Sequence, residues 1–232
     1  NIVTLEDPVE YYLTGINQSQ VRPEVGLTFA AGLRSILRQD PDVVMVGEIR
    51  DGETAELAIH ASLTGHIVLS TLHTNDAFGA VPRLIDMKVE PFLLASTLNV
   101  IVAQRLVRKI CSECKEELKV PDNVFKEVET ELKKINKDFW PEELKASGSI
   151  KFYHGVGCEK CNKTGYKGRL AIAEVLANTD TLKDIVSSGK MDTETLKKEF
   201  LAQGLLDVKQ DGILKALRGL TTIEEIMRAT RE

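Results

Sequence analysis

The sequence contains few aromatic residues, no long apolar run and few cysteines. Aromatic residues make up 5% of the 232 residues, whereas apolar residues make up 43%, as is typical of soluble globular proteins. No apolar run approaches the roughly 20 residues that a membrane-spanning helix requires, and no signal peptide opens the chain. The net charge of −5 argues against a surface that binds nucleic acid along the whole chain. These absences predict a globular protein without a membrane span, a secretion signal or a nucleic-acid partner.

A further absence concerns phosphate binding. The pattern G-x-x-x-x-G-K-[ST], whose backbone amides cradle nucleotide phosphates, does not occur. The segment Gly165-Tyr166-Lys167-Gly168 contains the residue types at the wrong spacing. The chain opens at Asn1, without Met, and Ile2–Leu5 already has the pattern of a strand. We therefore expect an N-terminal portion of the protein to be missing, and we expect this chain to bind nucleotide poorly by itself.

Residues 1–108 alternate between strand and helix patterns. Short apolar segments that end at polar or glycine residues predict strands at Ile2–Leu5, Val43–Val46 and His66–Ser70. Amphipathic or apolar helix patterns separate and follow them, at Thr28–Arg38, Glu53–Leu63 and about Pro91–Arg105. Thr28 has the residue type of a helix N-cap. Strands separated by helices predict a parallel α/β sheet.

The composition changes after Arg108. Residues 109–170 contain both cysteine pairs, with a strongly charged helical segment, Asn123–Lys137, between them. Residues 174–232 return to helical periodicity, with one apolar face in each segment. We therefore expect three parts, which are an α/β core over residues 1–108, a cysteine-rich element over 109–170 and a helical domain over 171–232.

Polar side chains follow each of the three predicted strands. The candidates, in chain order, are Glu6, Asp7 and Glu10, then Gly47 and Glu48, then His73. Taken alone, each group fits a solvated loop or, for the histidine, a hydrogen-bonded structural residue. Because the carboxyl ends of parallel strands share one edge of a sheet, the three groups should converge. Carboxylates placed there can orient or polarise a water molecule, and the convergence favours a site that cleaves a phosphoanhydride.

The cysteines form two close pairs, Cys111-Ser112-Glu113-Cys114 and Cys158-Glu159-Lys160-Cys161. Each C-x-x-C turn aims two thiolates at one point, and four thiolates satisfy a tetrahedral Zn²⁺ ion. Because the protein fills all four positions, this zinc site should be structural rather than catalytic. The 43 residues between the pairs exceed the spacing of compact ribbons, so the charged helix must be inserted between the two turns. A redox dithiol and free structural cysteines remain alternatives.

Five segments resemble the motifs of the type II/type IV secretion ATPase family, the hexameric motors of bacterial type II secretion and type IV pilus assembly. They are Glu6–Glu10, Gly26–Ala30, Leu37–Asp42, Val46–Asp51 and Ser62–Asn75. The resemblance covers essentially the whole chain. It implies a RecA-like P-loop NTPase core that uses ATP and Mg²⁺, with a tetracysteine zinc element and a helical C-terminal domain. The cysteines resemble the assembly and secretion branch, since the retraction motors of the family generally lack them.

The resemblance also implies roles for the acidic residues. Glu6 corresponds to the water-activating carboxylate of the family's Asp box, which includes Asp7 and Glu10. Gly47 and Glu48 fall at the Walker B position, where Glu48 is implied in the organisation of Mg²⁺ and water.

His73 falls in the family's His box and is implied as a γ-phosphate contact, with His66 nearby. The family's Walker A loop and phosphate-sensing arginines do not occur in this sequence. We therefore expect the fragment to be inactive by itself, although the parent would be an ATPase.

By resemblance, the parent forms a homohexamer and works in the cytoplasm, peripheral to the bacterial inner membrane. Its partners would be an inner-membrane platform protein and a cytoplasmic docking protein. Pilus assembly and type II secretion both stay open, and the long insertion between the cysteine pairs slightly favours pilus assembly. A rival interpretation from another class is a non-catalytic, zinc-stabilised docking or scaffold module.

Overall fold

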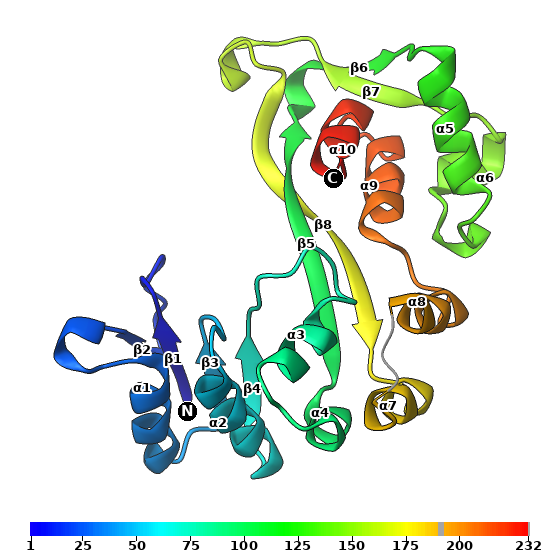
Figure 1. Ribbon diagram of the computed structural model, residues 1–232. Coiled ribbons are helices and arrows are strands. Elements are labelled where there is room, and N and C mark those ends of the chain that lie inside the picture. The colour runs from blue at the N-terminus through cyan, green and yellow to red at the C-terminus, as the bar shows by residue number, and fades with distance from the viewer. Residues whose placement is uncertain (190–192, 232) are drawn as a thin grey trace. The chain divides into compact units, whose positions relative to one another are not determined.

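The computed structural model describes residues 1–189 and 193–231 (Figure 1). The chain divides into two compact units, residues 1–101 with 177–199 and residues 102–176 with 200–232. This division differs from the three expected parts, because the chain leaves the first unit at residue 101 and returns to it for residues 177–199. None of the helices among the described residues is long and apolar enough to cross a membrane.

The first unit holds four strands and most of the helices that flank them: β1 (Ile2–Glu6), β2 (Asn17–Gln20), α1 (Phe29–Ile36), β3 (Val43–Val46), α2 (Gly52–Leu63), β4 (Ile67–Ser70), α3 (Ala80–Asp86), α4 (Pro91–Thr97) and α7 (Asp180–Ser187). Most residues of the following elements belong to the second unit: β5 (Val100–Ile110), β6 (Lys115–Leu118), α5 (Asp122–Leu132), α6 (Glu142–Ser147), β7 (Phe152–Gly155), β8 (Tyr166–Ala177), α9 (Val208–Leu217) and α10 (Ile223–Ala229). The helix α8 (Thr193–Ala202) begins in the first unit and ends in the second.

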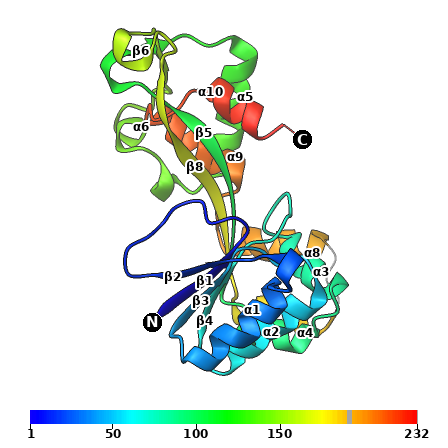
Figure 2. The same ribbon diagram turned by 90° about the vertical axis from the view of Figure 1, so that its left-hand side faces the viewer.

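A parallel four-stranded sheet with the order β2-β1-β3-β4 is the centre of the first unit. This sheet confirms the expected α/β class and contains the three predicted strands. Side chains alternate between the two faces of a strand, and along β1 Val3 and Leu5 are buried on the face that α1 and α2 cover (Figure 2). Leu5 packs so closely on Gly32 of α1 that an added Cβ would lie 2.7 Å from its Cδ2 atom.

The strand β2 was not expected, because its sequence Asn17-Gln18-Ser19-Gln20 is wholly polar and has low strand propensity. It forms as an edge strand that pairs in parallel with β1, from Val3 opposite Asn17 to Glu6 opposite Gln20. An edge strand has one face or one side in solvent, so polar side chains are tolerated there.

The two helices on the sheet begin at side-chain caps. The backbone N–H of Ala31 donates to the Thr28 hydroxyl at 3.2 Å, which confirms the predicted N-cap of α1. The backbone N–H of Thr54 donates to the Asp51 carboxylate at 2.8 Å, and this cap marks the start of α2, shortly after β3 ends at Val46. Each cap satisfies one of the backbone donors that a helix start leaves open.

The predicted helix at Pro91–Arg105 is wrong beyond Thr97. The helix α4 ends there, Leu98 is extended at φ −71° and ψ 126°, and β5 begins at Val100. The run Val100-Ile101-Val102 is β-branched, and such residues favour strands. Its partner strand is β8, with which β5 forms a two-stranded sheet. The helical pattern expected from residue 174 likewise begins only at Asp180, because β8 continues to Ala177.

The second unit has its own apolar core. The segment inserted between the cysteine pairs forms an antiparallel ribbon, in which Lys115 of β6 lies opposite Gly155 of β7, and carries α5 and α6. The charged segment predicted as a helix over Asn123–Lys137 forms α5, which ends earlier, at Leu132, and its apolar residues Val128 and Leu132 are buried. The core joins this insertion to β8, α9 and α10, and its members include Val128, Leu132, Leu144, Phe152, Ile172, Ile213, Leu214, Ile223 and Ile226.

A buried carboxylate fastens β5 to α10 in the second unit. Glu225 is 2% exposed and accepts hydrogen bonds from the backbone N–H of Arg108 at 3.0 Å and from its guanidinium at 2.6 Å. Arg228 donates to the same carboxylate at 2.9 Å. The Arg108 guanidinium also lies 4.1 Å from the centre of the Tyr166 ring. The Arg108 side chain, opposed in part by burial, lowers the pKa of Glu225 to about 2.

Replacement of Glu225 by Gln should destabilise the second unit at neutral pH. The neutral amide cannot accept from both arginines as a carboxylate does, so we expect the free energy of unfolding at pH 7 to fall by about 2 kcal/mol. The folded pKa lies below that of an unfolded glutamate, so the ionised form stabilises the fold above about pH 4.5 and loses this effect as the pH falls toward 2. Urea unfolding at a series of pH values measures both effects.

The matched control is Glu224→Gln, which changes the exposed neighbour on the same helix turn. Its free energy of unfolding should change by less than about 0.5 kcal/mol. If the two variants lost equal stability, or if the loss in Glu225→Gln did not shrink in acid, the Arg108–Glu225 contact would not be what fastens β5 to α10.

Candidate functional site

The carboxyl ends of β1, β3 and β4 meet at one edge of the sheet in the first unit. The pairing sets Leu5 opposite Val46 and Val46 opposite Ser70. Beyond the strands, the backbone N–H of Gly47 donates to the carbonyl of Leu5 at 2.7 Å. The hydroxyl of Thr71 donates to the carbonyl of Gly47 at 2.6 Å. These bonds hold the segments that follow all three strands next to one another, as the parallel arrangement predicts.

Gly47 is needed because the chain that leaves β3 passes close to the end of β1. A Cβ built at this position would lie 3.0 Å from the carbonyl oxygen of Leu5 and 3.3 Å from the Cα of Glu6. Any side chain would therefore push the backbone of Glu6 away. The glycine lets the acidic ends of β1 and β3 approach each other.

Glu48 is the centre of an ionic network at this edge. It is 8% exposed. One carboxylate oxygen pairs with Arg50, and the other lies 2.8 Å from Nε2 of His73. Arg50 also reaches the carboxylate of Asp7, at 3.6 Å. The structure thus brings Asp7, Glu48 and His73 together, one from each strand end.

The hydrogen bond from Arg50 lowers the pKa of Glu48, although burial opposes it, and His73 lowers the pKa further. Glu48 is therefore a carboxylate at neutral pH with both oxygens engaged. A buried anion that keeps its charge needs such partners.

Glu6 belongs to a separate network. Its Oε1 accepts from the hydroxyl of Thr4 at 2.5 Å and from the side-chain amide of Gln18 at 2.9 Å. Over the residues that the structure describes, no donor reaches its Oε2. The two acidic candidates thus differ, because Glu48 has both oxygens engaged and Glu6 keeps one free.

The other candidates lie at the margin of these networks. Glu10 is exposed in the segment after β1, and its carboxylate makes no ion pair with a described residue. His66 lies at the opposite end of β4 from His73, where its Nδ1 is 2.9 Å from the carbonyl of Ala61 and 3.1 Å from the Thr64 hydroxyl. His66 therefore supports the turn before β4, and the expectation that it lies near His73 is wrong.

Three residues that contact the candidates were missed in the sequence, namely Thr4, Gln18 and Arg50. Arg50 stands in the segment Gly47–Asp51, but a single arginine after an acidic strand end is indistinguishable from a solvated charge. Gln18 lies on β2, whose polar sequence hid the strand and with it the pairing to β1. Once β2 is recognised, the two-residue period of strands would have placed Gln18 beside Thr4 and Glu6.

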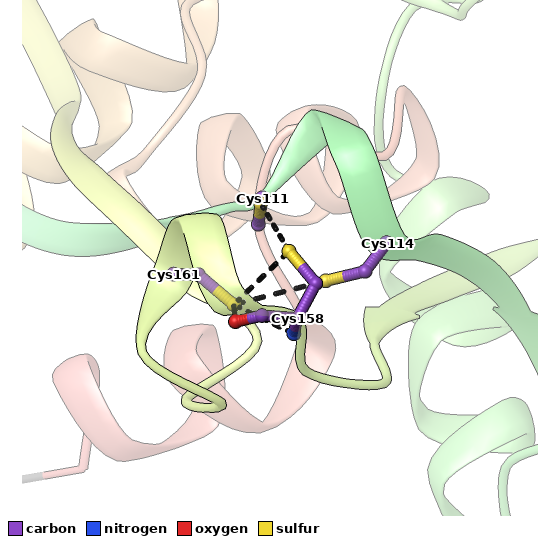
Figure 3. Close-up of side chains that lie close together, drawn as sticks. All are labelled: Cys111, Cys114, Cys158 and Cys161. Atoms are coloured by element: carbon purple, nitrogen blue, oxygen red, sulfur yellow. Dashed lines mark hydrogen bonds between the residues drawn. The ribbon is translucent and has the colours of Figure 1, made fainter.

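The four cysteines converge in the second unit, as predicted (Figure 3). All four sulfur atoms lie within 4.8 Å of one another. The Sγ–Sγ distances are 3.8 Å for Cys111–Cys158, 3.9 Å for Cys114–Cys161 and 3.7 Å for Cys158–Cys161. Disulfide sulfurs would be about 2.05 Å apart, whereas tetrahedral Zn–S bonds of about 2.3 Å place sulfurs about 3.8 Å apart. The geometry fits four thiolates around one metal ion.

The backbone of the second turn is shaped to support these sulfurs. The N–H groups of Cys158 and Gly165 donate to the Sγ of Cys161, at 3.2 Å and 3.3 Å. Gly165 has φ +77°, and a Cβ on it would lie 2.3 Å from the carbonyl oxygen of Gly155. Only glycine fits both this left-handed conformation and this close crossing.

The thiols differ in their affinity for protons. The backbone N–H of Cys158 lowers the pKa of Cys161, whereas burial raises the pKa of Cys114. A metal must be bound by thiolates, so a divalent cation would displace protons from the group as it binds.

The family comparison agrees with the motifs at the strand ends. The model of the family described as "Type II/IV secretion system protein" matches residues 1–228. The type II secretion system protein E of Dickeya dadantii is 49% identical over 232 residues, which are 100% of this chain and 43% of that protein. The type IV pilus assembly ATPase PilB of Thermus thermophilus is 49% identical over 239 residues, covering 100% of this chain and 25% of that protein. The chain therefore spans less than half of the length of these relatives.

Solved structures show the same fold. The crystal structure of the pilus retraction motor PilT with bound ADP matches 100% of this chain and 52% of that chain, with a TM-score of 0.65 and 26% sequence identity. The α/β architecture is thus shared with this motor protein.

The tetrathiol group should bind one zinc ion per chain. Replacement of Cys158 by Ser should abolish stoichiometric zinc, because it removes one of four ligands, and should lower the midpoint of thermal unfolding by several degrees. Metal analysis of the purified protein and cobalt substitution, which gives thiolate-to-cobalt absorption, measure the binding.

His154→Ala is the matched control, since it removes the histidine of the neighbouring strand β7 and leaves all four thiols. It should keep full zinc. Zinc retained by Cys158→Ser, or lost from His154→Ala, would contradict a four-sulfur site.

Proposed function

Because the chain belongs to the type II/IV secretion system protein family, we propose that it supplies the acidic half of the nucleotide site of a motor ATPase. The protein that carries it hydrolyses ATP with Mg²⁺ and uses the energy for type II secretion or type IV pilus assembly. The observation that carries this proposal is the pair of networks at one sheet edge, in which Glu48 is fully engaged and Glu6 keeps a free oxygen.

The two carboxylates suit different tasks. Glu6 has an available Oε2 and is the group that accepts a proton from water as its oxygen attacks the γ-phosphorus, while the bond to the β-phosphate breaks and ADP leaves. Glu48, with Asp7 beside it, provides oxygen ligands of the kind that Mg²⁺ takes. When bound, Mg²⁺ neutralises the developing phosphate charge. His73 is paired with Glu48, yet its side chain is 85% exposed, so a γ-phosphate can reach the ring.

The phosphate-binding loop is expected from sequence outside this chain, since its pattern does not occur in the 232 residues and the relatives are more than twice as long. We therefore propose that the chain is inactive by itself. In the parent it forms a homohexamer in the cytoplasm, peripheral to the bacterial inner membrane, through a platform protein and a docking protein. Zinc holds the tetracysteine element in shape, and α9 and α10, which share an apolar core with the segment between the cysteine pairs, form the helical C-terminal part of the protein.

ATP hydrolysis by the full-length protein tests this function. Glu6→Gln and Glu48→Gln should each lower kcat by about 100-fold or more, because each removes a charged group that the reaction uses. Nucleotide binding by Glu6→Gln, measured with a fluorescent ATP analogue, should stay within about threefold of the wild type.

Glu56→Gln is the control, because Glu56 is an exposed residue on α2 whose side chain is 71% exposed. It should hydrolyse ATP at the wild-type rate. If Glu6→Gln and Glu48→Gln also kept that rate, the acidic edge would have no part in hydrolysis, and the chain would be better explained as a zinc-stabilised docking module.

A further inference from the structure

Gln18 is the residue that connects the Glu6 carboxylate to the neighbouring strand and loop. We propose that Gln18 is a positioning residue for the ATPase reaction, which holds Glu6 with one oxygen fixed and the other available. This inference rests on the proposed function of Glu6, and it adds a residue that no motif of the sequence pointed to.

The strand register places Gln18 beside Glu6. Thr4 lies opposite Gln18 and Glu6 lies opposite Gln20 in the parallel pair β1–β2. All four side chains share the sheet face away from α1 and α2, because Leu5 between Thr4 and Glu6 points into the helix-covered core. Gln18 is thus the diagonal neighbour of Glu6, within reach of a long side chain.

The hydrogen bonds at Glu6 act on one oxygen only. The Thr4 hydroxyl and the Gln18 amide both donate to Oε1, at 2.5 Å and 2.9 Å. Thr4 is 4% exposed and Gln18 is half-buried, so both donors are held by the sheet rather than by solvent. Two donors on one oxygen set the rotation of the carboxylate and turn Oε2 away from them. A proton acceptor needs this kind of fixed orientation, since small displacements of a catalytic group cost rate.

The Gln18 amide is itself held in place by the loop between β1 and β2. Its Nε2 also donates to the carbonyl of Tyr11 at 2.9 Å, and its Oε1 accepts from the backbone N–H of Leu13 at 2.6 Å. These two loop contacts fix both ends of the amide and therefore prevent it from flipping. The Glu6 carboxylate is oriented by a group whose own orientation is determined.

Gln20 provides a matched control on the same strand and face. It lies directly opposite Glu6 in the register, yet its Oε1 accepts a long hydrogen bond from the backbone N–H of Val9, at 3.4 Å, rather than bonding to the carboxylate. Gln20 is therefore bonded to the same loop as Gln18, and within the described residues it makes no hydrogen bond to the carboxylate. A general effect on the loop should appear in both positions, whereas an effect through Glu6 should appear only at Gln18.

The experiment measures ATP hydrolysis by the full-length protein with Gln18→Met, Gln20→Met, Glu6→Gln and the double variant Gln18→Met/Glu6→Gln. Methionine keeps the length of glutamine and removes its hydrogen bonds. Gln18→Met should lower kcat about tenfold, with the KM for ATP within about twofold of the wild type. Gln20→Met should change neither. In the Glu6→Gln background, Gln18→Met should have no further effect, because a residue that acts through Glu6 loses its role when Glu6 is gone.

The outcomes separate the two proposals. A wild-type rate in Glu6→Gln overturns the role of Glu6 and the inference with it. A loss in Glu6→Gln with full kcat in Gln18→Met leaves the proposed function intact and overturns the inference alone. Equal losses in Gln18→Met and Gln20→Met, or a tenfold further loss in the double variant, also overturn it, since Gln18 would then act on the loop or on folding. Thermal unfolding of each variant identifies one that fails to fold, and Gln18→Asn, which keeps the amide on a shorter chain, then takes the place of Gln18→Met.

Discussion

The parallel register between β1 and β3 is the constraint on which the candidate site depends. With Leu5 opposite Val46, the chain leaves β3 at Gly47, directly against the backbone of Glu6. If β3 shifted by one residue relative to β1, its side chains would turn to the opposite face of the sheet, and the buried Val44 and Val46 would leave the core. The apolar core under α1 and α2 therefore fixes the position of the acidic residues, although none of them contributes to that core.

The second unit brings together four sulfur atoms from two turns that are far apart in the sequence. Bringing distant segments together costs loop entropy, which grows slowly with length. The ribbon β6–β7 reduces that cost, since its pairing of Lys115 with Gly155 places the ends of the insertion beside the two turns. The backbone N–H of Cys111 also donates to the carbonyl of Gly165 at 3.0 Å, and that of Val156 to Cys114 at 2.9 Å. A metal would thus bind a group that the backbone already brings together.

The sequence predicts well what depends on local pattern. Short β-branched runs locate β1, β3 and β4, Thr28 marks the start of α1, and the C-x-x-C spacing predicts the sulfur cluster. It predicts poorly what depends on distant partners. The periodicity of the apolar run after Pro91 does not separate a helix from a strand, and Val100–Ile110 forms a strand by pairing with β8, which begins far away in the sequence at Tyr166. The polar strand β2 is stable because β1 offers an open edge, and Asn17–Gln20 carries no local sign of it.

The contrast between local pattern and distant partners also explains why the sequence could locate the acidic residues but could not distinguish their environments. Glu6 and Glu48 both follow an apolar strand, so the sequence presents them as equivalent. Their environments come from other elements, since Arg50 and His73 engage both oxygens of Glu48 while Thr4 and Gln18 engage one oxygen of Glu6. A carboxylate that is held through both oxygens keeps its charge and its position and still has lone pairs for a cation, whereas one with a free oxygen can accept a proton there. The difference between the two carboxylates therefore arises from the side chains that surround them rather than from the residue type.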